Sequence, residues 1–445
     1  MVFTIVINFL DHKLFNIVNN RIKSYKDLVC NIIMSEFETT YIDYTPDLVT
    51  YNSDKIKTKS YKPKHGTTEY TILNYDDTIV CDNDDKLGVY RSIVLNPDNN
   101  TILCFTPPKT MTLECFKESN PDVTSSDVLV NEIIEGTMLT LFYDPRIESW
   151  ELASKGAIGG NYWFYRTQYS QLKSNPTQPT FRKMFLDAFR ACEGEDINDL
   201  TCLNELSKEY CYNFILQHPS NHIVLHVLAP VVYLVSVFHL KGTVATAIPP
   251  TVYEEWNCFL GLRGLIEFPK RFEEESYDKL EEMYCSVNSP HNSLGLMFTN
   301  VKTGMMASLE NPTYKEVREL RGNNPNLQYQ YLCLLRMGKV MDFLKFFPQY
   351  KQVFYRFYKE FQEFVTNVHQ SYISYYVRKS GQQISKKYFP LIYKLHHETF
   401  LPSLGEGKEK IIMRRSEIGK RLAEMAPSEL IYYLNYNKQE SEIII

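Results

Sequence analysis

The run Asn131-Glu-Ile-Ile-Glu-Gly-Thr-Met-Leu-Thr-Leu-Phe-Tyr143 decides how this chain folds around its centre. Its β-branched and aromatic second half predicts a strand, and Trp150–Ala153 predicts a partner strand across the turn residues Asp144-Pro145. The glycine of this run, Gly136, would let another backbone approach closely, so the segment can be read as an ordinary strand start. A second hairpin is predicted where two β-rich runs flank the turn residues 97–100.

The composition is that of a globular protein in a reducing compartment. The chain has 445 residues, enough for two or three domains, and it is 44% hydrophobic and 23% charged. The net charge of −5 means that any nucleic-acid surface must be local. Ten cysteines are scattered without a Cys-x-x-Cys pair, which argues against a zinc site and a disulfide framework. Histidines 218, 222 and 226 are too far apart on a strand to share an ion, so no metal site is expected.

No membrane association is expected from the sequence. The first ten residues lack the basic start and the cleavage site of a signal peptide, and they predict an opening strand instead. The longest apolar run, residues 223–238, is too short to cross a bilayer, and it predicts two buried strands broken at Pro230. The expected location is cytoplasmic.

Three regions follow from the pattern along the chain. Residues 1–85 mix strands and turns, and residues 86–325 are rich in strands with a helical pattern at 180–192. In residues 326–445 the aromatic residues between Phe343 and Val368 recur every three to four positions, which predicts an amphipathic helix or helix pair, with Pro348 at a helix start or a kink. An α+β fold with antiparallel sheets, flanking helices and an all-α C-terminal domain is therefore predicted.

Five stretches in order resemble the phage-type RNA ligase 1 family, ATP-dependent enzymes of the covalent nucleotidyltransferase superfamily. They begin or centre at Tyr90-Arg91, Phe105-Thr-Pro-Pro-Lys109, Glu135-Gly-Thr, Ser154-Lys155-Gly-Ala-Ile and Phe214-Ile-Leu-Gln-His-Pro-Ser-Asn221. The resemblance implies a ligase-type nucleotidyltransferase core around a nucleotide cleft. Arg91, Lys109 and Lys155 match retained family positions, and the resemblance places Glu135, Gly136, Phe214 and Asn221 in that cleft.

The same resemblance shows where this chain departs from the family. The family carries its reactive lysine in the pattern Lys-x-Asp-Gly, but Ile133 stands at that position and no lysine occurs between Lys117 and Lys155. Leu294 replaces the glutamate that helps to hold the metal, and Ser308 and Glu310 replace the two lysines that grip phosphate.

These replacements remove the chemistry of covalent adenylation. The reaction needs a neutral lysine amine to attack the α-phosphorus of ATP, and isoleucine cannot form a phosphoramidate. A glutamate at position 310 places negative charge where positive charge should absorb the growing charge on the phosphates. We therefore expect a degenerate ligase-like protein that needs no cofactor. The alternatives are an active ligase that uses ATP, magnesium and a relocated lysine (Lys109 or Lys155), and a structural or interaction protein.

An RNA-binding surface is predicted within residues 377–421, which carry eleven basic residues against four acidic ones. Aromatic residues lie among these cations, a combination that favours phosphate attraction and base stacking. A solvated helix face over an aromatic core is the alternative. Composition and resemblance together favour a large cytoplasmic DNA virus as the source, so a viral protein complex is a second possible partner. The predicted RNA contacts are Lys386, Lys387, Arg414, Arg415, Lys420 and Arg421.

Overall fold

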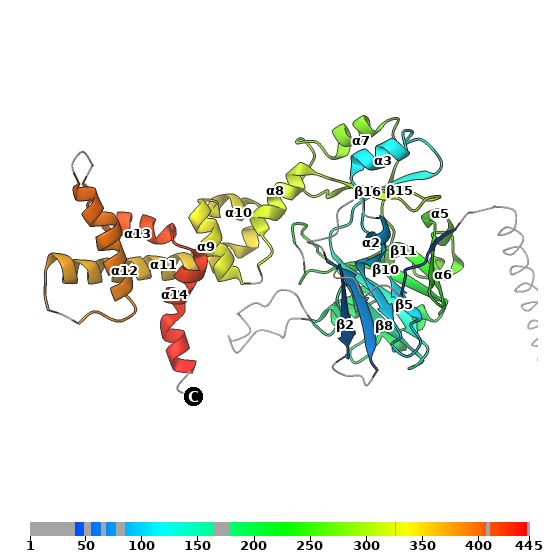
Figure 1. Ribbon diagram of the computed structural model, residues 1–445, viewed down its shortest axis with the longest axis horizontal. Helices are drawn as coiled ribbons and strands as arrows, with labels where there is room; N and C mark the ends of the chain where they lie inside the picture. Colours follow the sequence, from blue (N-terminus) through cyan, green and yellow to red (C-terminus); the bar gives the residue numbers. More distant parts are fainter. Residues whose placement is uncertain are drawn as a thin grey trace, which may run out of the picture.

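The fold combines three antiparallel sheets with a separate run of helices. The computed structural model describes residues 41–48, 55–63, 68–76, 85–162, 179–221, 223–324, 326–381, 383–405 and 410–442 (Figure 1). The strand predicted at residues 1–10, most of the acidic loop before residue 85 and His222 lie outside these ranges. Within them, no helix is both long and apolar enough to cross a membrane.

The largest sheet has eight strands. Its strand order is β1-β12-β11-β10-β7-β8-β9, with antiparallel neighbours, and the short strand β13 pairs in parallel with β11. The predicted hairpin across Asp144-Pro145 is confirmed as β7 and β8. The strand bounds are β1 Ile42–Tyr44, β7 Thr137–Asp144, β8 Ser149–Ser154, β9 Ala157–Ile158, β10 Tyr210–Gln217, β11 Val231–Lys241, β12 Val244–Ile248 and β13 Ile266–Glu267.

Two four-stranded sheets complete the strand-rich part. One has the order β2-β3-β4-β5 and contains the second predicted hairpin, β4 with β5; the other has the order β14-β6-β15-β16. Because β3 pairs with β4, the domain boundary predicted at residue 85 falls within the span of one sheet. The bounds are β2 Ile56–Tyr61, β3 Tyr70–Tyr75, β4 Ile93–Leu95, β5 Ile102–Phe105, β6 Val128–Glu132, β14 Arg271–Phe272, β15 Gly295–Asn300 and β16 Met306–Glu310.

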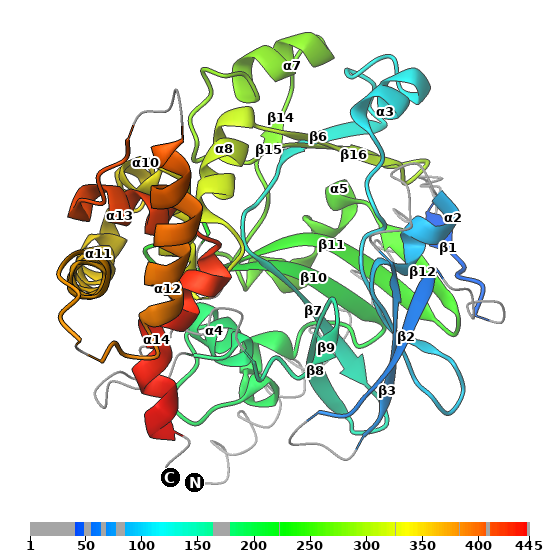
Figure 2. The ribbon, with the colours of Figure 1, turned by 60° about the vertical axis from the view of Figure 1, so that its left-hand side comes forward.

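Strand alternation decides which side chains face the helices and which face the space between the sheets. On β15, Leu296 and Phe298 are buried with residues of α3 and α7, whereas Met297 points the other way. Figure 2 shows this sheet lying across from the β10–β11 part of the large sheet. The helices of the strand-rich part are α2 Asp85–Gly88, α3 Leu113–Ser119, α4 Phe181–Ala188, α5 Pro250–Tyr253, α6 Asn257–Leu260 and α7 Tyr277–Tyr284.

All regular elements described after Asn311 are helical, as predicted (Figure 1). The aromatic periodicity corresponds to α10 and α11, separated by a short 3-10 turn at Pro348–Tyr350, and Phe343, Phe347 and Phe354 are fully buried between them. The bounds are α8 Pro312–Arg321, α9 Leu327–Met337, α10 Val340–Phe346, α11 Lys351–Tyr372, α12 Phe389–Lys394, α13 Arg415–Ala423 and α14 Pro427–Glu442, with π-helical turns at Ile373–Val377 and Leu395–Phe400.

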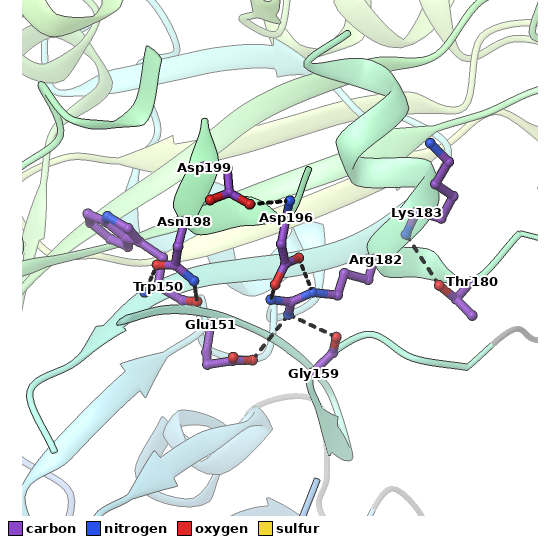
Figure 3. Close-up of polar contacts among 9 residues, drawn as sticks. All are labelled: Trp150, Glu151, Gly159, Thr180, Arg182, Lys183, Asp196, Asn198 and Asp199. Atoms are coloured by element: carbon purple, nitrogen blue, oxygen red, sulfur yellow. Dashed lines mark hydrogen bonds and ion pairs between the residues drawn. The ribbon is translucent and has the colours of Figure 1, made fainter. Parts of the chain in front are cut away.

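Arg182 ties α4 to the edge of the large sheet (Figure 3). Its guanidinium donates two hydrogen bonds of 2.6 Å to the Asp196 carboxylate, and it also contacts Glu151 at 3.3 Å and the Gly159 carbonyl at 3.2 Å. Only 11% of the Arg182 side chain is exposed. The planar fork of arginine matches a carboxylate with two parallel bonds, which a lysine cannot do.

Replacing Arg182 with alanine is expected to lower the free energy of unfolding by about 2 kcal/mol, because Asp196, Glu151 and the Gly159 carbonyl lose their shared hydrogen-bond donor. Urea denaturation measures this loss. Lys183→Ala is the matched control, since Lys183 is half exposed and its pair with Asp187 should contribute under about 0.5 kcal/mol. Equal stability of the two variants would contradict the structural role of Arg182.

Candidate functional site

The four positions at which this chain departs from the ligase pattern lie together in space. The backbone N–H of Ile133, just after β6, donates to the Gly295 carbonyl at 3.0 Å, which puts Ile133 beside the start of β15. Leu294 precedes that start directly. On the neighbouring strand β16, Ser308 pairs with Met297 and Glu310 pairs with Gly295. The order of motifs in the sequence thus corresponds to one region of the structure.

None of these four side chains offers a nucleophilic amine or a built metal site. Leu294 packs against the hydrophobic cluster of the C-terminal helices. Glu310 is about half exposed, and one of its oxygens lies 4.0 Å from Arg318. No group of three or more histidine, cysteine or acidic side chains that could hold a metal ion occurs in the described ranges. The side chain of Ile133 thus carries no amine, and that of Leu294 carries no oxygen that could bind a metal ion.

A cavity of about 360 Å³ separates the large sheet from the sheet of β6, β15 and β16. Its lining is mostly hydrocarbon and includes Ile133 itself. Two polar atoms in its lining, Asn131 Oδ1 and Ser236 Oγ, are buried and have no hydrogen-bond partner among the described residues. Arg91 lines it, and the lining residues that the structure describes include no lysine. The apolar lining includes Ile133, Ile134, Met138, Ile215, Met297 and Met306.

Of the four residues predicted to form the nucleotide cleft, Gly136 alone is among the described lining residues of the cavity. Phe214 is fully buried on the opposite face of β10, where it packs against Phe185 and Phe189 of the α4 segment. Its neighbour Ile215 takes the cavity side, because adjacent residues of a strand point to opposite faces. Phe214 therefore faces away from this cavity.

Asn221 is also absent from the lining of the cavity. Its side chain is 8% exposed and donates a hydrogen bond of 2.8 Å to the Thr137 hydroxyl. This bond holds the turn after β10 against the start of β7. Asn221 thus has a structural role in joining two strands of the large sheet.

Glu135 is a buried hydrogen-bond centre and does not line the cavity. Its carboxylate accepts from the backbone N–H groups of Ile223, Val224 and Leu225 at 3.0–3.2 Å, and from the Tyr314 hydroxyl at 2.8 Å. Burial and the neighbouring charge of Glu135 raise the pKa of the Tyr314 phenol, which keeps it a donor. Through Tyr314, the first turn of α8 is fixed to the strand-rich part.

The same contacts correct the prediction for residues 223–238. Strand β11 begins after Pro230 as expected, but Ile223–Leu225 form a bend and no strand. Their N–H groups turn toward the Glu135 carboxylate, so they are unavailable to a neighbouring strand.

The three retained basic residues gather at the end of β3. The Nζ atoms of Lys109 and Lys155 lie 5.7 Å and 5.2 Å from the centre of the Tyr75 ring. The Asn74 side-chain amide donates to the carbonyl oxygens of Arg91 and Lys155, at 2.9 Å and 2.6 Å, which joins the two loops. An aromatic face attracts cations, so Tyr75 holds positive charge beside the Arg91 end of the cavity.

Four of the six predicted RNA contacts are exposed: Lys386, Arg414, Arg415 and Lys420. Lys387 is 8% exposed, with its amine 5.6 Å and 5.5 Å from the ring centres of Phe364 and Tyr388, so little of its side chain is accessible to RNA. Arg421 is paired with Glu417 at 2.9 Å and Glu424 at 3.3 Å, which neutralises most of its attraction for phosphate. Lys387 lies in the turn before α12, where packing against aromatic rings buries it, whereas Arg421 is neutralised by ion pairs along α13. A count of charges in the sequence registers neither effect.

Tyr75 and Tyr314 are site residues that the sequence did not reveal. Each acts through a contact with a residue far away in the chain, and neither sits in a recognisable motif. Tyr75 ends strand β3, and Tyr314 lies in the first turn of helix α8.

Comparisons with known proteins give one relative in sequence and several in structure. No protein-family model matches the chain. A protein of Invertebrate iridescent virus 6, described as an immediate-early protein ICP-46 homolog, is 21% identical over 354 residues, which cover 71% of this chain and 75% of that protein. The chain therefore has a viral relative.

The similar solved structures are ligases. A Naegleria gruberi RNA ligase variant with AMP and manganese has a TM-score of 0.31 at 10% identity, over 43% of this chain and 52% of the ligase. An Aquifex aeolicus protein assigned as an ATP-dependent DNA ligase has a TM-score of 0.35 at 12% identity, over 67% of this chain and 66% of that protein. The match to the Naegleria ligase thus spans about half of that protein's length.

Proposed function

We propose that this chain is an RNA-ligase-like protein that binds RNA without forming a lysyl-AMP intermediate. The observation that carries the proposal is the side chain of Ile133, which lines the cavity where the resemblance places the reactive lysine. A hydrocarbon has no lone pair, so it cannot attack phosphorus. The phage-type assignment belongs to this proposal, as does the degeneracy.

The surrounding residues support the same conclusion. A lysine that replaced Ile133 in function would have to reach the cavity, but Lys109 and Lys155 lie at the Tyr75 ring and are not among its lining residues. Leu294 cannot coordinate a metal, and Glu310 would repel phosphate. We therefore propose that the protein works without ATP and magnesium as reactants.

RNA binding is proposed from the charge of the helical region. Residues 377–421 carry an excess of positive charge in a chain whose overall charge is −5, and four of the predicted contacts are exposed. Local clusters of cations bind phosphate backbones by releasing counterions, even when the whole protein is acidic. With a viral relative known, we propose a cytoplasmic site of action in infected cells, where a viral protein complex is a further expected partner.

Incubation with α-labelled ATP and magnesium tests the absence of covalent adenylation. No label is expected on the chain after denaturing electrophoresis, while an active covalent ligase treated in parallel becomes labelled. A labelled chain whose label disappears in Lys109→Ala or Lys155→Ala would overturn the proposal in favour of a relocated nucleophile.

Salt-dependent RNA binding tests the second half of the proposal. Fluorescence anisotropy of the full chain with labelled RNA should show affinity that falls as salt rises, and the double change Arg414→Glu/Arg415→Glu should weaken binding about 10-fold or more. The charge-matched control is Lys183→Glu/Lys302→Glu, on the strand-rich part. A structural or interaction protein would instead show no salt-dependent RNA binding, and the change Arg414→Glu/Arg415→Glu would leave its affinity for RNA unchanged.

A further inference from the structure

Four aromatic rings form a continuous exposed row at the end of the helical region. Tyr375, in the π-helical turn after α11, contacts Phe389 of α12 with ring centres 5.6 Å apart. Phe389 is 6.4 Å from Tyr393, and Tyr393 is 4.1 Å from His397, each one helical turn further along. The exposed fractions of Tyr375, Phe389 and Tyr393 are 44%, 40% and 51%, and His397 is also exposed. Exposed aromatic side chains in contact with one another usually mark a binding surface.

A second layer of rings supports the first. His396 stacks on Tyr376 at 3.7 Å with an angle of 13° between the planes, and on Phe400 at 5.2 Å. The Tyr372 hydroxyl is 3.0 Å from His396 Nδ1. Burial lowers the pKa of His396, and the neighbouring His397 lowers it further, so this layer stays uncharged near neutral pH. The outer rings therefore pack on a fixed second layer. Because they are already ordered, they lose less conformational entropy when a ligand binds.

The charge around the aromatic row favours a polyanion. Residues 377–400 contain a single carboxylate, Glu398, and five lysine or arginine residues. Of these five, Lys387 is buried and Lys394 lies 3.9 Å from Glu429, so the other three supply the exposed positive charge. Arg378, Lys379 and Lys386 are exposed on the segment between the first π-helical turn and α12, and each lies within four positions of Tyr375 or Phe389 in the sequence. A protein partner with an acidic face would match this charge, but it would not need exposed aromatic rings, on which nucleic-acid bases of any sequence can stack.

We propose that this row is a stacking surface for unpaired RNA nucleotides. The proposal rests on the RNA binding proposed above and adds the kind of RNA: single-stranded segments, whose bases are free to lie on the rings while the phosphates meet the flanking cations. Bases within a duplex are already stacked on one another and do not reach such a surface. Phe389 and Tyr393 are the central rings of the row and should contribute most.

The double variant Phe389→Leu/Tyr393→Leu tests the surface. In the full chain, its affinity for a fluorescein-labelled oligoadenylate should fall about 10- to 100-fold, because each lost stacking contact weakens binding several-fold. The salt dependence should stay unchanged, since no cation is removed. Both residues are substantially exposed, so the thermal midpoint should match that of the unmodified chain.

Tyr355→Leu/Tyr358→Leu is the matched control. These two tyrosines are exposed and stacked at 6.5 Å on the same helix α11. Tyr358 lies roughly 20 Å along that helix from Tyr372, at 1.5 Å per residue. The control should bind oligoadenylate normally, and it should keep the quenching of a 2-aminopurine base that the Phe389/Tyr393 variant loses.

The outcomes separate this inference from the proposed function. RNA binding that survives in the Phe389/Tyr393 variant would overturn the stacking surface alone, and so would an equal loss of affinity for a fully paired RNA hairpin. Absence of salt-dependent RNA binding in the unmodified chain would overturn the proposed function and the stacking surface with it.

Discussion

Replacing Glu135 with alanine is expected to lower the free energy of unfolding by about 3–5 kcal/mol, because several buried donors lose their acceptor at once. The donors are the N–H groups of residues 223–225 and the Tyr314 hydroxyl, and Glu135 itself is 4% exposed. Urea denaturation measures the loss. Hydrogen exchange should locate it, with faster exchange at residues 223–225 than in the remainder of the chain.

Two further variants define the size of this effect. Tyr314→Phe removes one donor and keeps the rest, so a loss of about 1–2 kcal/mol is expected. Glu132→Ala removes a neighbouring glutamate whose carboxylate accepts one hydrogen bond, from Lys270 N at 2.8 Å, and it should cost under about 1 kcal/mol. If Glu135→Ala were as stable as Glu132→Ala, the hydrogen-bond centre would have no energetic importance.

The role of Glu135 changes how the ligase resemblance should be understood. At the position where the family has an aspartate, this chain uses its carboxylate to fasten a loop and the first turn of α8. A residue with a strong structural role stays useful after catalysis is lost. This explains, on the proposed function, how the Glu-Gly pair can persist beside Ile133.

Secondary-structure elements that depend on residues close together in the sequence were predicted well. Both hairpins, helix α4 and the division between α10 and α11 follow from turn residues and periodicity within a few positions. The positions at which the sequence departs from the ligase pattern also lie close together in the structure. The backbone N–H of Ile133, after β6, donates a hydrogen bond to the carbonyl of Gly295 at the start of β15.

Three features that the sequence did not reveal depend on contacts between residues far apart in the chain: the face that Phe214 takes, the partners of Glu135 and the burial of Lys387. Phe214 faces α4 because the pairing of β10 decides its face, and a shift of one residue would have put it in the cavity. Glu135 meets partners 88 to 179 residues away, so its role cannot be read from its neighbours. Lys387 raises the charge count of its segment, but packing against Phe364 and Tyr388 keeps its amine from the surface.

The wall of the cavity depends on a close approach that only glycine permits. A Cβ atom at Gly295 would lie 2.0 Å from the Leu309 carbonyl oxygen and 3.0 Å from the Glu310 Cα, both of them on β16. The φ angle of Gly295, 142°, is also one that other residues rarely adopt. Strands β15 and β16 supply Met297 and Met306 to the cavity, so their separation would change its shape.

Gly295→Ala is therefore expected to lower the free energy of unfolding by about 3 kcal/mol, through overpacking between two paired backbones that cannot move apart without losing hydrogen bonds. Gly156→Ala is the control, because nothing lies within 4 Å of its added Cβ, and its stability should stay within about 0.5 kcal/mol of the unmodified chain. Urea denaturation of both variants measures the difference. A Gly295→Ala protein as stable as Gly156→Ala would mean that β15 and β16 can separate without cost. The cavity beside Ile133 would then lack a rigid wall on the side of these two strands.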